Sequence, residues 1–315
     1  MNHTFDHGGL FGINRLKLFF ALSRTPHGII DIAGPALAAL LCLGAFPSFY
    51  TVILGLITAF AGYTAVYALN DVVDFRIDKE KVNISGYGES ENDLDSVWVR
   101  HPLAKGMLSL KAGLIWVLVW MSLALIGAYL LNPVCALILL GGAIFEIIYC
   151  RMLKVSPLRS LINGVVKSCG AIAAVFAVNP NPSFLFLGIL FLWIFFWEIG
   201  GQNIPNDWTD LDEDKRFCAQ TIPVKLGPAR AGIICMICLL ISFIMNQFLL
   251  LASPLHFSAG YFIATLIFNA YFLLLPALRL NITKNSAAAM TLFNKASYFP
   301  LVILGLVLFR FLQAP

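Results

Sequence analysis

Long apolar runs follow one another along almost the whole sequence, and they limit what the chain can fold into. A helix needs about 20 consecutive apolar residues to cross the hydrocarbon core of a bilayer. The chain is 59% hydrophobic and 12% charged, whereas soluble domains carry about 25% charged residues. The pattern therefore predicts an all-α polytopic membrane protein with nine transmembrane helices, over residues 27–46, 50–69, 110–131, 133–150, 160–179, 183–203, 231–252, 257–279 and 296–313.

The segment before the first span has a different character. Residues 10–22 place apolar side chains around Arg15 and Lys17, a pattern typical of a helix that lies on the membrane surface. No small-residue cleavage site follows it, so we expect this segment to stay attached. The connections are short, which predicts one membrane domain over residues 1–315 with its longest loops at 70–109 and 204–230.

The distribution of basic residues indicates the orientation. Of the 21 Lys and Arg residues, all except Lys167 and Arg310 lie before the first span, in the connections after even-numbered spans, or at the span ends beside them. Positively charged connections remain in the cytoplasm. We therefore expect a prokaryotic inner-membrane protein with a cytoplasmic N-terminus and the C-terminus on the opposite side. A net charge of +4 distributed in this way gives no support for a nucleic-acid partner.

One nine-residue pattern, N-D-x-x-D-x-x-x-D, occurs twice in these connections. The first copy runs from Asn70 to Asp78 after the second span, and the other from Asn206 to Asp214 after the sixth. If the helix continues through each copy, positions i, i+4 and i+8 fall about 40° apart around its axis. Each copy would then stack three oxygen-bearing side chains on one face, which are Asn70, Asp74 and Asp78 in the first and Asn206, Asp210 and Asp214 in the second.

Crowded carboxylates repel one another and call for a compensating cation. Oxygen-only ligands favour Mg²⁺, which usually completes its coordination shell with water and substrate phosphates. Paired acidic clusters at a membrane interface therefore predict a lipid-linked diphosphate as the substrate. The alternative is that the motifs are solvated helix ends, but two matching copies favour the metal-binding interpretation.

Basic and polar side chains near the motifs are candidates for contacting phosphate. Lys167 lies about two turns inside the fifth span, where a charge must face the bundle interior, and we include it among the catalytic candidates. Asn163, one turn earlier, would extend it into a polar stripe that reaches toward the diphosphate. Glu198 and Gln202 form a similar i, i+4 pair, with an interhelical hydrogen bond as the alternative role. The cytoplasmic candidates, which the orientation rule also explains, are Arg24, Arg76, Lys79, Arg100, Arg151 and Lys154.

These motifs resemble the UbiA superfamily of intramembrane prenyltransferases over nearly the whole chain. The first motif is similar to the family's NDxxDxxxD, and Arg100–Gly106 is similar to its R-P-L/I-x-x-G segment. The second motif and the following Thr221–Gly227 are similar to a DxxxD followed by T-x-P-V-x-x-G. The remaining matches are Arg24–Pro26 before the first span and Tyr149–Lys154 after the fourth.

The resemblance implies a nine-helix bundle with a cytoplasmic active-site cap and an isoprenoid diphosphate donor held by two Mg²⁺ ions. Asn70 and Asp74 would hold one ion. Asp210 and Asp214 would hold the other. The residues expected to support these ligands or assist the leaving diphosphate are Arg24, Asp71, Arg76, Asp78, Lys154, Asn163 and Asp207. The residues expected to contact the substrate are Arg24, Arg76, Arg100, Tyr149, Lys154, Asn163 and Asn206.

Two features depart from the family pattern. Residues 84–99 add an acidic, Gly/Ser-rich stretch, and His101 is inserted between Arg100 and Pro102. The composition of the stretch is compatible with a lid that orders over the substrate and with a surface insertion.

The resemblance favours an aromatic acceptor of quinone biosynthesis, such as 4-hydroxybenzoate. A porphyrin or chlorin, a naphthoate, a glycerol lipid or a phosphoribosyl donor are alternatives within the same architecture. A cation-coupled transporter is the alternative from another class, but it would bind its ions near the membrane midplane. The acidic motifs here follow the spans, which favours the enzyme.

Overall fold

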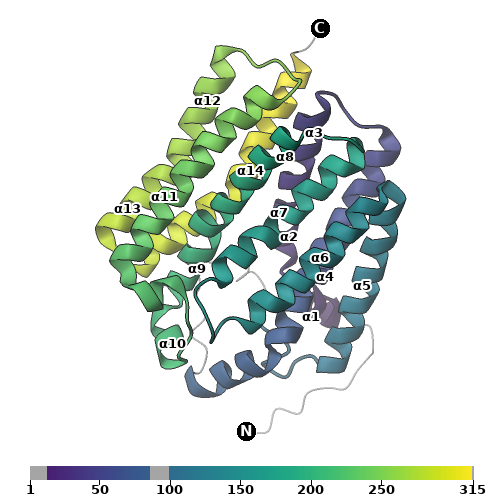
Figure 1. The fold of residues 1–315 in the computed structure, drawn as a ribbon. Coiled ribbons are helices and arrows are strands. Elements are labelled where there is room, and N and C mark those ends of the chain that lie inside the picture. Colours follow the sequence, from purple (N-terminus) through teal and green to yellow (C-terminus); the bar gives the residue numbers. More distant parts are fainter. Residues whose placement is uncertain (1–12, 86–98, 314–315) are drawn as a thin grey trace.

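The computed structural model describes residues 13–85 and 99–313, and their regular structure is helical throughout. Nine helical segments of this part of the chain are long and apolar enough to cross a membrane, which confirms the predicted bundle (Figure 1). The predicted lid stretch lies mostly outside the described residues. The N-terminal helix and the first five spans comprise α1 (Ile13–Leu22), α2 (Thr25–Asp31), α3 (Ala33–Leu43), α4 (Phe49–Ser85), α5 (Leu110–Leu131), α6 (Pro133–Arg151) and α7 (Arg159–Val178).

The remaining four spans include two π-helical segments. They comprise α8 (Phe184–Trp197), a π-helix (Glu198–Asn203), α9 (Ile204–Thr209), α10 (Leu211–Arg216), α11 (Ile222–Ala252), α12 (Ala259–Asn269), a second π-helix (Ala270–Leu274), α13 (Leu275–Thr283) and α14 (Ser286–Leu312). Three of the spans are not single α-helices. A turn at Ile32 separates α2 from α3 in span one, and spans six and eight change to π-helical winding.

Two spans begin earlier in the chain than their apolar runs predict. α14 begins at Ser286, ten residues before the predicted start, because Asn285 caps the helix by accepting a hydrogen bond from the Ala288 amide at 2.8 Å. α11 begins at Ile222, and its backbone leaves helical geometry at Gly227, where φ is 79°. Hydropathy locates the apolar part of a helix, whereas its capping residues set where it begins.

The long helix α4 carries the first acidic motif beyond the apolar part of its span. It has 37 residues, and about 20 suffice to cross the hydrocarbon. The motif is therefore helical, as the sequence predicts. In Figure 1 the blue end of α4 and the short helix α10 lie at the same lower end of the bundle, opposite the yellow end of α14. Both motif-bearing segments thus meet at one end of the molecule.

Close packing fixes the π-helix that precedes the second motif. A Cβ added at Gly200 would lie 2.8 Å from the Cys235 carbonyl oxygen, and one at Gly201 would lie 2.9 Å from the Ala296 Cβ. The Trp197 indole Nε1 also donates to the Ala296 carbonyl at 3.1 Å. α11 and α14 therefore hold this segment from two sides, and only glycine fits at the contact.

We expect Gly200→Ala to lower the unfolding midpoint in detergent, because its methyl group would push the π-helix away from α11. Overpacking of this kind costs about 1 to 3 kcal/mol. Gly188→Ala is the matched control, since a Cβ at Gly188 in α8 meets no atom within 4 Å. Equal midpoints for the two variants would contradict the close-packing argument.

Candidate active site

A cavity of about 400 Å³ begins beside the acidic motifs and extends along the bundle. Its lining on α4 runs from Thr51 to Asn70, a length of about 29 Å in an α-helix. Small and apolar side chains line the far end, including Ala39, Leu139 and Val178. The polar end is lined by sequence-predicted residues from five parts of the chain, which are Arg24, Asn70, Arg100, Tyr149 and Asn206.

The first motif contacts α6 and the residue that precedes α2. The Asn70 Nδ2 donates to the Glu146 carboxylate at 2.7 Å, which connects α4 to α6. Arg24 Nη2 lies 3.5 Å from the Asn70 Oδ1 and 3.4 Å from the buried Asp71 carboxylate. Arg24 has a positive φ of 44°, and this left-handed conformation precedes α2. Arg24, predicted to contact the diphosphate, thus lies beside the first motif.

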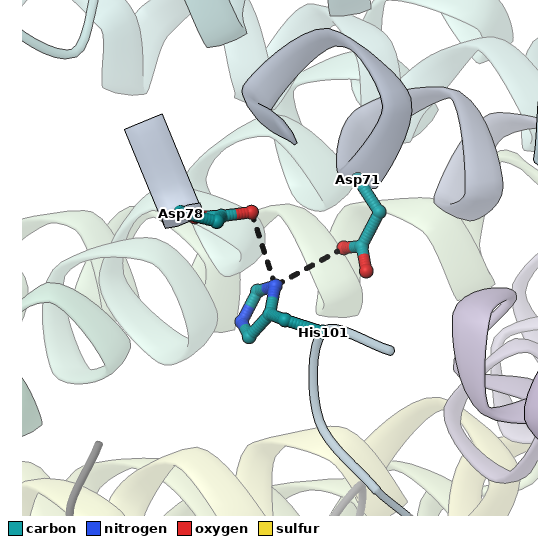
Figure 2. Close-up of side chains that lie close together, drawn as sticks. All are labelled: Asp71, Asp78 and His101. Carbon is teal, nitrogen blue, oxygen red and sulfur yellow. Dashed lines mark ion pairs between the residues drawn. The ribbon is translucent and has the colours of Figure 1, made fainter. Parts of the chain in front are cut away.

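His101 lies between two carboxylates of the same motif (Figure 2). Its Nδ1 is 3.1 Å from Asp78 Oδ2 and 3.5 Å from Asp71 Oδ1. Burial alone would lower the pKa of the imidazole, but the two carboxylates raise the pKa of His101 to about 9. Its backbone is left-handed, with φ of 52°. The residue that interrupts the family's R-P segment thus supplies a positive charge to the first motif, a role that the sequence had not revealed.

The second motif does not continue as one helix, so the expected stacking on a single face is wrong for this copy. α9 ends at Thr209, and Asp210 has φ of −98° and ψ of 12° before α10 begins. Lys81 of α4 reaches across to this motif, with its Nζ 3.4 Å from Asp214 and 3.9 Å from Glu213. Lys81 therefore joins the two motifs, although in the sequence it is one more basic residue beside the membrane.

Arg159 is a second basic residue that the sequence analysis missed. Its guanidinium carbon lies 4.2 Å from the centre of the Tyr149 ring, and its Nη1 lies 3.9 Å from the Asp207 carboxylate. The Tyr149 hydroxyl accepts a hydrogen bond from the Asn203 Nδ2 at 3.0 Å. Arg159 is buried at the start of α7, so the second motif receives its positive charge from inside the bundle.

Arg76 and Lys154, both predicted to contact the diphosphate, do not line the cavity. Arg76 is on an exposed side of α4. The Lys154 Nζ is 3.5 Å from a Glu80 oxygen and 3.5 Å from the centre of the Phe217 ring, with 40% of the side chain exposed. Their roles at the diphosphate remain predictions.

Asn163 and Lys167 line the cavity, but their partners lie deeper in the bundle than the motifs. Lys167 Nζ donates to Asp31 Oδ2 at 2.5 Å, and Asn163 Nδ2 donates to Glu198 Oε1 at 2.7 Å. Gln202 donates to the Phe293 carbonyl of α14 at 3.2 Å, which is the interhelical hydrogen bond that the sequence analysis gave as its alternative role. The predicted polar stripe is therefore part of a separate buried cluster.

The donor atoms of the two motifs fit a hard divalent cation. Asp74 Oδ1 of the first motif and Asp207 Oδ2 of the second are buried without a hydrogen-bond partner among the described residues. Burial and the nearby Asp210 raise the pKa of Asp214, while Lys81 opposes this shift. Buried carboxylate oxygens without donors cost free energy. Oxygen ligands of this kind are the ones that Mg²⁺ prefers.

Comparisons with known proteins agree with this architecture. Residues 32–298 match the UbiA prenyltransferase family. The digeranylgeranylglyceryl phosphate synthase of Thermococcus sibiricus is 26% identical over 212 residues, which cover 67% of this chain and 69% of that protein. The enzyme of the same name from Pyrococcus horikoshii is 26% identical over 223 residues, or 69% of this chain and 72% of that protein.

Two solved structures share the fold. The apo structure of a UbiA homolog from Aeropyrum pernix K1 has a TM-score of 0.72 at 18% identity, covering 92% of this chain and 99% of that chain. A UbiA homolog from Archaeoglobus fulgidus bound to DMAPP and Mg²⁺ has a TM-score of 0.67 at 17% identity, covering 94% of this chain and 99% of that chain.

We expect His101→Ala to destabilise the protein in EDTA, because it removes the positive charge between Asp71 and Asp78. Removing one partner of a buried ion pair costs about 3 to 5 kcal/mol. Added Mg²⁺ should recover more of the unfolding midpoint in the variant than in the wild type, since a cation would replace the lost charge. Lys154→Ala is the control, because an exposed pair contributes at most about 1 kcal/mol. A midpoint unchanged by His101→Ala would contradict the assigned role.

Proposed function

The chain belongs to the UbiA prenyltransferase family, and we propose that it transfers a prenyl group from an isoprenoid diphosphate to a hydroxyl group of a glycerol lipid, with Mg²⁺ as cofactor. The observation that carries this proposal is the meeting of two acidic motifs at the polar end of one long, mostly apolar cavity. The relatives named digeranylgeranylglyceryl phosphate synthase favour a glycerol lipid over the aromatic quinone precursor expected from the sequence.

The donor would lie with its diphosphate at the motifs and its isoprenoid chain along the cavity. Support comes from the Archaeoglobus fulgidus homolog, whose structures hold DMAPP or GPP together with Mg²⁺. The lining of α4 from Thr51 to Asn70 is long enough for an extended prenyl chain. Apolar walls around that chain keep water from the reactive carbon.

Four residues are the proposed metal ligands, and they fit the donor chemistry. Asn70 and Asp74 would hold one Mg²⁺, and Asp210 and Asp214 would hold the other. When bound, the metal ions neutralise the diphosphate and make it a better leaving group. Asp71, Asp78 and Asp207 would support the ligands through their buried positions in the same motifs.

The other charged groups at the motifs would bind and orient the diphosphate. Arg24 and Arg100 line the cavity at its polar end, where they can face phosphate oxygens. Arg159 contributes a buried positive charge beside Asp207. Tyr67, one turn before the first motif, also lines the cavity, so its ring can face the positive charge that develops at the allylic carbon.

The orientation is part of the same proposal. The basic residues favour the motif end of the bundle on the cytoplasmic side of a prokaryotic inner membrane, with residues 1–315 forming one membrane domain. A water-soluble diphosphate product could then leave directly into the cytoplasm, while both lipid substrates remain in the membrane.

We expect Asp74→Asn and Asp210→Asn each to lower prenyl transfer at least about 100-fold without unfolding the protein, because each removes a proposed metal ligand. Product formation by purified protein with Mg²⁺ measures the effect. Asp212→Asn is the control, since 90% of the Asp212 side chain is exposed. Normal activity in either ligand variant would refute its assignment.

The acceptor can be identified by diphosphate release from isoprenoid diphosphates. We expect Mg²⁺-dependent release with a glyceryl phosphate that already carries one prenyl ether, and little release with 4-hydroxybenzoate. Release with the aromatic acceptor alone would restore the quinone-precursor hypothesis. Absence of release with every acceptor, despite folded protein, would favour another donor or a transport function.

A further inference from the structure

A second charged cluster lies in the cavity, deeper in the bundle than the acidic motifs. It joins Asp31 of α2, Lys167 of α7 and Glu198, the first residue of the π-helix. Lys167 Nζ also donates to the Tyr67 hydroxyl at 3.1 Å, and that hydroxyl hydrogen-bonds to Asp31. Tyr67 is one helical turn, or about 5 Å, before the first motif. The cluster therefore lies where the reactive end of a prenyl chain would follow its diphosphate.

The two carboxylate oxygens of Glu198 have different surroundings. Oε1 accepts the hydrogen bond from Asn163 at 2.7 Å. Oε2 is buried and has no hydrogen-bond partner among the described residues, and Lys167 Nζ lies 3.9 Å from it. Lys167 donates instead to Asp31 and Tyr67. The residue is only 5% exposed and it lines the cavity. A buried acceptor of this kind is suited to a donor group of the substrate.

The backbone holds this carboxylate in a fixed place. Glu198 begins the π-helix that α11 and α14 clamp at Gly200 and Gly201, where an added methyl group would have no room. π-Helical turns occur frequently at functional sites, because the extra residue in the turn redirects side chains. The Trp197 indole anchors the preceding residue to α14. Packing and one hydrogen bond thus orient Glu198 toward the cavity.

We propose that Glu198 is a catalytic residue that accepts the proton of the acceptor hydroxyl, an inference that rests on the proposed function. The hydroxyl oxygen bonds to the allylic carbon while the bond from that carbon to the diphosphate breaks. The diphosphate leaves with the electron pair, and the hydroxyl proton moves to Glu198 Oε2. An ether and diphosphate are the products, and Glu198 returns the proton to solvent before the next turnover. Lys167 is a positioning residue for this carboxylate, because its ammonium lies 3.9 Å from Oε2, and Asp31 in turn holds Lys167 by a hydrogen bond.

Glu198→Gln is the informative variant because it separates hydrogen bonding from proton acceptance. The amide oxygen can still accept the hydrogen bond from Asn163, but the amide is not a base. General bases contribute about 100- to 10,000-fold to rates. We expect kcat with the glyceryl acceptor to fall at least about 100-fold, with an unchanged Kd for the isoprenoid diphosphate in the presence of Mg²⁺.

A thiol analogue of the acceptor distinguishes a base from a structural residue. A thiol has a pKa of about 8.5 and loses its proton far more readily than an alcohol, so it needs little help from a base. We expect the rate of Glu198→Gln with the thiol to lie within about tenfold of the wild-type rate. A structural role for Glu198 would produce equal losses with the alcohol and the thiol.

The outcomes separate this proposal from the proposed function. Wild-type protein that makes no ether from the glyceryl acceptor would overturn both the proposed function and the role of Glu198. Ether formation by the wild type with full activity in Glu198→Gln, or with equal losses for the two acceptors, would overturn the role of Glu198 alone. If Glu198→Gln does not fold, Glu198→Asp replaces it, because the shorter side chain withdraws the carboxylate from the hydroxyl. It too should lose more activity with the alcohol than with the thiol, and equal losses would again overturn the role.

Discussion

Carboxylates gathered beside an apolar cavity are the constraint on which the rest of the structure depends. The motifs come from distant parts of the sequence, and their mutual repulsion in a poorly solvated place has to be offset. Three basic residues do this from inside the protein: His101 between two carboxylates of the first motif, Arg159 beside Asp207, and Lys81 beside Asp214. The same concentration of negative charge prepares the site for divalent cations, and through them for a diphosphate.

Three chemical environments follow one another along the cavity. Its motif end is charged, the cluster around Lys167 lies about one helical turn further into the bundle, and small or apolar side chains line the remainder. This order matches the order of groups in an isoprenoid diphosphate, which has a charged head, a reactive allylic carbon and an apolar tail. In the proposed reaction, bond formation would occur beside the buried cluster, where Glu198 and Tyr67 line the cavity.

Irregular helix geometry coincides with the site. The π-helix at Glu198–Asn203 and the break at Asp210 lie on either side of the start of the second motif. In a regular α-helix Glu198 and Asn203, five residues apart, would point about 140° apart around the axis, whereas π-helical winding brings them closer to one face, toward Asn163 of α7 and Tyr149 of α6. The glycines that allow α11 to approach this segment therefore matter to both packing and chemistry.

The sequence by itself determined the nine spans, the two acidic motifs and the choice of a hard cation, because hydropathy and i, i+4 spacing are local properties. It also singled out Arg24 as a substrate-contacting candidate through the family resemblance, and the structure places that side chain beside the first motif. Tertiary structure alone decided which basic residues enter the site. The orientation rule accounts equally well for every basic residue at the motif end of the bundle, so Arg159 and Lys81 could not be distinguished from exposed ones. Their roles, like those of His101 and Glu198, depend on contacts between helices that are distant in the sequence, and only the packing of the bundle brings these side chains together.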